Sequence, residues 1–125
     1  MLKDLELSGR LAADMDPQLL QFLTEKVDSF VKWDLLRFFH ENPHTTDTAQ
    51  NIARYAGRNP ELVRADLAAL ARAGILEESQ LGDMTVYSLG SDPAMREMVR
   101  QLVESARERQ FRLKVLYHIV RGLEA

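Results

Sequence analysis

The chain has 125 residues, no cysteine and a formal net charge of −3, with 46% hydrophobic and 28% charged residues. This size and composition are typical of one compact globular domain with a single core. The lack of cysteine excludes disulfides, thiolate metal sites and thiol catalysis, so we expect a cytoplasmic protein without a metal or cofactor. The mild negative charge gives no global attraction to nucleic acid, so any DNA-binding surface must be local.

Neither a membrane span nor a secretory signal is expected. No apolar run approaches the roughly 20 residues that cross a bilayer, and the opening segment MLKDLELSGR mixes acidic with apolar residues. We expect residues 1–15 to form a partly ordered arm, with a short helix as the alternative, and we assign no function to it.

Residues 16–41 contain either one long helix or two helices. A capping residue followed by Pro17 begins the first turn, and apolar residues then recur at helical spacing to about Glu41. The pair Asp28-Ser29 can cap a new start, which favours two helices that meet there.

The segment His40-Glu41-Asn42-Pro43-His44 spells HExxH, the two-histidine zinc motif of metalloproteases. That motif requires both histidines on one helix face. Pro43 lies inside the span and disfavours helix there, and no third ligand is evident. We therefore interpret the segment as a loop, and we expect no metal site, no catalytic residue and no enzymatic activity.

Two helices joined by a glycine turn follow. We expect a short helix over 49–56, ended by Gly57 in the left-handed conformation, and a second helix over 60–73 that Asn59 caps and Gly74 ends. The second helix has apolar residues at helical spacing that we expect to face the core: Leu62, Val63, Leu67 and Leu70. This arrangement is typical of a helix-turn-helix.

The runs 75–78 and 84–89 flank a short segment with Gly82 and Asp83, and the second run alternates as a strand does. The sequence therefore predicts a β-hairpin directly after the second helix.

The string TAQNIARYAGRNPELVRADLAALARAGILEE, continued by GDMTVYSL, resembles the bacterial ArsR/MarR/PadR type of winged helix-turn-helix regulator. The resemblance is carried by Ile52-Ala53, Gly57, Leu67, Leu70, Gly74-Ile75 and Tyr87. It implies a mainly α (α+β) fold with an N-terminal arm and helix over 1–27 and a winged domain over 28–90. It also implies a DNA-binding transcriptional regulator that places helix 60–73 in the major groove.

Residues 91–125 are predicted to form one long C-terminal helix. Its apolar residues follow a heptad seam, interrupted by Arg109, that we assign to dimerisation: Met95, Val99, Leu102, Ala106, Leu113, Leu116, Val120 and Leu123. About 30 helical residues span about 45 Å, longer than the winged domain needs for its own core. We expect a homodimer through the terminal helices; the alternative is a long helix that wraps its own monomer.

Local charge defines the candidate DNA-binding residues. From Arg54 to Arg72 there are four basic and two acidic residues, a net +2. Arg64 is the best candidate for a base contact, and Arg58 suits a phosphate. The full candidate set is Gln50, Asn51, Arg54, Arg58, Asn59, Glu61, Arg64, Ala65, Ala68 and Arg72.

The predicted hairpin argues against DNA binding, because it carries Glu77, Glu78 and Asp83 and no basic residue. Like charges on the hairpin and on phosphate repel. The alternative is a winged-helix module that binds protein partners and does not touch DNA. A small effector would fit between the long helix and the winged domain, near four aromatic residues: Trp33, Phe38, Phe111 and Tyr117. Aromatic residues at helical spacing are, however, more often part of the core.

Overall fold

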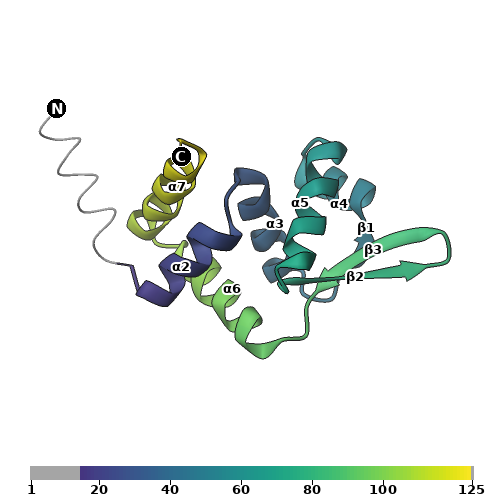
Figure 1. Ribbon diagram of the computed structural model, residues 1–125, viewed down its shortest axis with the longest axis horizontal. Coiled ribbons are helices and arrows are strands. Elements are labelled where there is room, and N and C mark those ends of the chain that lie inside the picture. Colours follow the sequence, from purple (N-terminus) through teal and green to yellow (C-terminus); the bar gives the residue numbers. More distant parts are fainter. Residues whose placement is uncertain (1–14, 125) are drawn as a thin grey trace, which may run out of the picture.

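The computed structural model describes residues 15–124, so the expectations for residues 1–14 and for residue 125 lie outside the described part (Figure 1). Within that part the elements are α2 (Pro17–Lys26), α3 (Phe30–Glu41), β1 (Thr46–Thr48), α4 (Ala49–Ala56), α5 (Pro60–Arg72), β2 (Leu76–Leu81), β3 (Met84–Leu89), α6 (Pro93–Ser105) and α7 (Arg109–Glu124). The predicted mainly helical α+β class is confirmed. Figure 1 shows α3 near the centre, with α2, α6 and α7 on one side and α4, α5 and the sheet on the other.

Two helices occupy residues 16–41, as favoured above. The Asp16 carboxylate accepts hydrogen bonds from the first backbone N–H groups of α2, and the chain leaves that helix at Val27. The Ser29 hydroxyl accepts from the Lys32 N–H at 3.0 Å and begins α3. A side-chain oxygen at the N-cap supplies an acceptor for an otherwise unpaired donor, which explains why the new helix begins there.

The α4–turn–α5 unit also has the predicted caps. The Thr48 hydroxyl accepts from the Asn51 N–H, and the Asn59 side chain accepts from the Glu61 N–H at 2.8 Å. Gly57 adopts φ 66°, a left-handed conformation that favours glycine and turns the chain between the helices.

The strands form an antiparallel sheet in the order β1-β3-β2, and β2 and β3 are the predicted hairpin. Facing pairs in the hairpin include Glu78 with Tyr87 and Leu81 with Met84. Because side chains alternate along a strand, these two pairs lie on opposite faces of the sheet. Glu78 and Leu81 therefore belong to different surfaces.

The core joins all the helices around α3. Its most completely buried side chains include Leu35, Leu36, Phe39, Ile52, Val63, Leu67, Leu70, Leu102, Val115 and Ile119. Trp33 is buried where α3 meets α6. Leu62, by contrast, is 57% exposed, so its assignment to the core is wrong. It lies one residue, or about 100°, away from Val63 on the α5 surface, and that rotation points it to solvent.

The prediction of one long helix over 91–125 is wrong, because α6 ends at Ser105 and α7 begins at Arg109. Tight i→i+3 bonds close the turn between them, from the Arg107 N–H to the Glu104 carbonyl and from the Glu108 N–H to the Ser105 carbonyl. The turn lets α7 pack beside α2 and bury its apolar residues in the monomer's own core. That burial offsets the loss of helical hydrogen bonds at a site without proline or glycine.

Candidate nucleic-acid interface

A groove of about 750 Å³ lies between α4, α5 and the hairpin. Five of the ten predicted DNA-binding residues line it: Gln50, Asn51, Arg64, Ala68 and Arg72. The hairpin contributes Glu78, Met84, Thr85 and Tyr87 to the same groove, and the start of α4 contributes Thr48 and Ala49. The structure therefore brings together half of the predicted set and adds residues from the hairpin.

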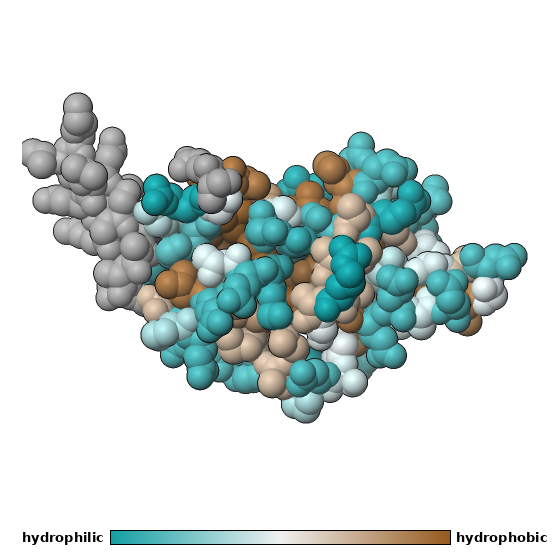
Figure 2. Space-filling model, in the orientation of Figure 1, coloured by the Kyte–Doolittle hydropathy of each residue, from teal (hydrophilic) through white to brown (hydrophobic). Residues whose placement is uncertain are grey.

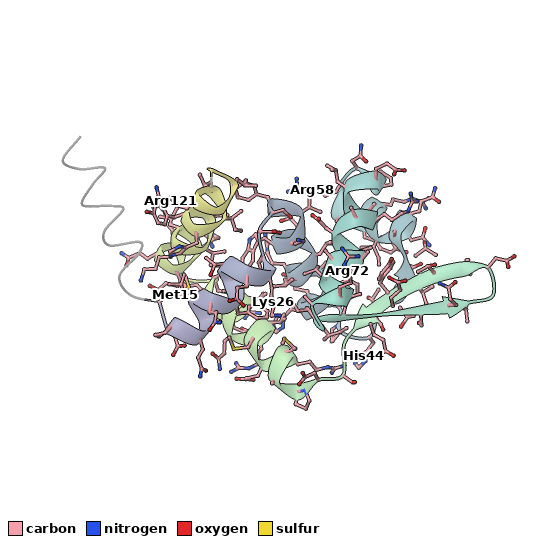
Figure 3. The ribbon with its side chains drawn as sticks, viewed as in Figure 1. Met15, Lys26, His44, Arg58, Arg72 and Arg121 are labelled. Atoms are coloured by element: carbon pink, nitrogen blue, oxygen red, sulfur yellow. The ribbon has the colours of Figure 1, made fainter. Side chains whose placement is uncertain are left out.

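The outward face of α5 carries charged and small side chains. Arg64, Ala65 and Arg72 are exposed and Ala68 is half-buried, whereas Val63, Leu67 and Leu70 on the opposite face are buried. Arg64 donates to Glu61 at 3.1 Å, but both side chains are mostly exposed, so this pair holds Arg64 weakly. Arg72 lies toward the hairpin end of α5 (Figure 3) and makes no ion pair with any described residue.

The other predicted residues lie outside the groove. Arg58 is at the opposite end of α5 from Arg72 (Figure 3), where its Nε donates to Asp34 of α3 at 2.8 Å. Asn59 caps α5, so its side chain has a structural role. Arg54 is exposed on the last turn of α4 and does not line the groove, and neither do the exposed Glu61 and Ala65 of α5. Within the groove, the side chain of Asn51 donates to Asp47 at 2.9 Å, so its amide is already engaged.

The hairpin wall places one carboxylate inside the groove. Burial raises the pKa of Tyr87, and the charge and hydrogen bond of its cross-strand neighbour Glu78 raise it further, while Arg64 and Arg72 act in the opposite sense. The groove therefore contains two guanidinium groups and one carboxylate that influence the same phenol. Glu77 pairs with Ser88 on the other face, so the three acids of the hairpin do not form one cluster.

Sequence reasoning missed Thr85 and Tyr87 as groove residues. A signal for them was present, because the alternation of the second strand places these two side chains on one face. What the alternation does not give is which face α5 lies beside.

The HExxH segment is a helix end and loop. α3 ends at Glu41, and His44 lies in the loop beyond it (Figure 3). Nε2 of His40 lies 2.8 Å from Oε1 of Glu104 on α6. Among the described residues, no group of three His, Cys, Asp or Glu side chains could hold a metal ion.

The aromatic residues considered for an effector do not gather in one cavity. Trp33 borders a cavity of about 130 Å³ with residues of α3, α6 and the following turn, whereas Phe38 stacks on Tyr55 with ring centroids 6.2 Å apart.

The predicted dimer seam is divided between core and surface. Val99, Leu102 and Ala106 are buried in the monomer's own core, so their assignment to a dimer interface is wrong. Met95 and Leu116 are half-buried against that core. The seam residues that face solvent are on α7: Leu113 at 41%, Val120 at 42% and Leu123 at 59% exposed.

No protein-family model and no curated protein matches the chain. In the part of the chain that the structure describes, no helix has the length and apolar character needed to cross a bilayer.

Proposed function

We propose that this protein is a dimeric DNA-binding transcriptional regulator of the winged helix-turn-helix class that places α5 in the major groove. The order of helix, strand, helix, turn, helix and hairpin supports that class. The observation that carries the proposal is the groove beside α5. Arg64 and Arg72, about two helical turns apart, both line it together with Ala68 and with residues of α4 and the hairpin.

The chemistry of this surface suits a duplex. Arg64 presents a planar guanidinium that can bond a guanine edge in bidentate fashion. Ala65 and Ala68 are small, so the helix backbone can approach base edges and thymine methyl groups closely. Gln50, exposed in the first turn of α4, is placed to bond a phosphate oxygen. Glu78 opposes these contacts, and we expect modest affinity as a result.

The regulator would bind as a dimer through α7, which carries the exposed part of the predicted seam. Two α5 helices that enter successive major grooves need to lie about 34 Å apart and project from one surface. A structure of the dimer tests this spacing directly.

Binding to random-sequence duplex in 50 mM and 200 mM salt tests the proposal. We expect measurable binding at the lower concentration and a steep loss at the higher one, because phosphate contacts release counterions. Arg64→Ala should weaken binding, and Arg37→Ala, which removes an exposed arginine of α3 outside the groove, is the matched control. Absence of binding in 50 mM salt would contradict the proposal.

The second candidate is a winged-helix module that binds protein. It is favoured by two large exposed hydrophobic side chains beside the α4–α5 turn, Tyr55 at 63% and Leu62 at 57%. The acidic hairpin favours it as well. A chain that is folded and dimeric but does not bind duplex in low salt would support this candidate.

A further inference from the structure

The hairpin β2–β3 has an exposed apolar tip with an acidic residue, Asp83, in its turn. Leu81 is 60% and Met84 50% exposed, and the two residues face each other across the final pair of the hairpin, where Met84 also borders the groove beside α5. Asp83 lies in the turn between them, and Glu77 lies on the same face of the sheet as Leu81. Figure 2 shows hydrophilic residues over the hairpin end, with a small hydrophobic patch among them. No basic residue occurs between Arg72 and Arg96.

Pairing within the hairpin holds the tip in shape. The hairpin ladder continues unbroken to the Leu81–Met84 pair, and Gln80 donates to the Thr85 hydroxyl at 2.8 Å one pair earlier. A tip that is already ordered loses little conformational entropy when it binds another surface.

α7 carries a surface of the opposite charge. Its residues at spacings of four and three share one helix face, which we call the α7 stripe: Arg109, Leu113, Leu116, Val120 and Leu123. All except Leu116 are exposed. Arg112, next to the stripe, is also exposed, although it already donates to the Ala106 carbonyl at 3.2 Å. The stripe is therefore apolar along its length and basic where α7 begins.

Hairpin tip and α7 stripe cannot meet within one molecule, because they lie toward opposite ends of its long axis (Figure 1). Of the seven large hydrophobic side chains exposed in residues 15–124, five belong to these two surfaces: Leu81, Met84, Leu113, Val120 and Leu123. One surface is acidic and the other basic, so each complements the other in charge as well as in apolar character.

We propose that the hairpin tip of one copy docks on the α7 stripe of a second copy, and that a two-fold axis repeats the contact. This inference rests on the proposed dimer, but not on DNA binding. A contact made twice closes the assembly as a dimer and doubles the buried area. That doubling matters because a specific interface buries about 1,200–2,000 Å², more than one hairpin tip provides. Asp83 then serves assembly, which explains why the turn of the hairpin carries an acid rather than the basic residue that DNA would attract.

Charge reversal with sedimentation velocity, in the absence of DNA, tests the contact. Asp83→Arg and Arg109→Glu should each weaken the homodimer by about tenfold or more, because each creates like-charge contacts at both copies of the interface. An equimolar mixture of the two variants should form a heterodimer as tight as the wild-type dimer, because both contacts then pair opposite charges. Glu97→Arg, on the exposed face of α6, is the matched control.

Several results would overturn the proposal. The wild-type chain could be monomeric at 100 μM, or the mixture could fail to restore the dimer. Alternatively, Asp83→Arg could leave the dimer intact while Leu113→Ser dissociates it, which would indicate that α7 pairs with α7. If Asp83→Arg disturbs the turn, as judged by circular dichroism, Leu81→Arg in the last pair of the hairpin replaces it in the mixture. Duplex binding of wild type and of Arg64→Ala, measured separately, reports on the proposed function independently of the outcome here.

Discussion

Arg58 in the α4–α5 turn is bonded to Asp34 in the middle of α3: its Nε donates to Oδ2 at 2.8 Å, and its terminal Nη2 donates to the same oxygen. The two side chains are only partly exposed. This pair ties the turn to the central helix and occupies an arginine that the sequence suggests for phosphate contact.

Arg58→Ala should therefore lower stability more than DNA affinity. A charge-assisted pair in this setting contributes about 0.5–1 kcal/mol, reduced by its partial exposure. Urea unfolding of Arg58→Ala, Asp34→Ala and the double variant measures the coupling between the two side chains. If the losses in unfolding free energy of the two single variants add up to that of the double variant, the pair contributes nothing to stability. A large loss of duplex affinity in Arg58→Ala would assign the residue to DNA binding instead.

Glu78→Gln should lower the pKa of Tyr87 and strengthen duplex binding. The carboxylate raises that pKa through its charge and its hydrogen bond, so its removal leaves burial as the main remaining cause of the upward shift. Loss of a negative charge from the groove should raise affinity about 2- to 10-fold. Tyrosinate absorbance, with Tyr87→Phe as the reference, follows the titration. Glu77→Gln, on the opposite face of the sheet, should leave the pKa of Tyr87 nearly unchanged.

Two leucines of α5 should differ sharply in their contribution to stability. Leu67 is fully buried and Leu62 is 57% exposed. Leu67→Ala should cost about 2–5 kcal/mol, because it opens a cavity in the core. Leu62→Ser should change the free energy of unfolding by less than about 0.5 kcal/mol. Chemical denaturation of both variants checks the difference, and a severe loss from Leu62→Ser would contradict the exposure found here.

The contact between His40 and Glu104 should make stability depend on pH. Hydrogen bonding to His40, with the nearby Arg107 and Arg100, lowers the pKa of Glu104 in the folded state. A carboxylate with a lowered pKa stabilises the fold above its unfolded pKa, and the contribution is lost as pH falls through the folded value. Glu104→Gln should therefore destabilise the protein near pH 6, with a difference from wild type that shrinks below about pH 4. Thermal melts across this range test it; a difference that stays constant would exclude the ionised carboxylate as its cause.

Substitution by alanine should lower stability at Gly90 and raise it at Gly122. A Cβ on Gly90 would lie 2.9 Å from the carbonyl oxygen of Ile75, which also accepts the Gly90 N–H, whereas nothing lies within 4 Å of a Cβ on Gly122 in α7. Gly90→Ala should lower the melting temperature, because backbone must shift to admit the methyl group. Gly122→Ala should raise stability by about 0.5–1 kcal/mol through helix propensity. Calorimetry of the two variants compares them directly.

The local part of this fold was predictable, because caps and turns depend on neighbouring residues. Ser29, Asn59 and Gly57 begin or end helices where their side chains or backbone freedom require. The turn between α6 and α7 was not, because it contains no helix breaker and depends on the burial of Val115 and Ile119 beside α2.

The candidate site was predictable only in part, because some of its residues are placed by neighbours in the sequence and others by contacts between distant segments. The outward position of Arg64 and Arg72 follows from helical spacing within α5. The partner of Arg58 lies 24 residues away on another helix, and the face of the hairpin that borders α5 depends on how the sheet packs. Such contacts between distant segments have no periodic signal in one sequence.

The turn after Ser105 divides one heptad pattern into two segments with separate physical roles. Residues before it, such as Val99 and Leu102, are buried in the core and stabilise the fold, while Leu113 and Leu123 beyond it face outward. Substitutions in the first segment should appear in denaturation curves, and those of the exposed residues in the dependence of molecular mass on concentration. Mutation of these exposed residues should therefore weaken the proposed dimer while the monomer keeps its shape.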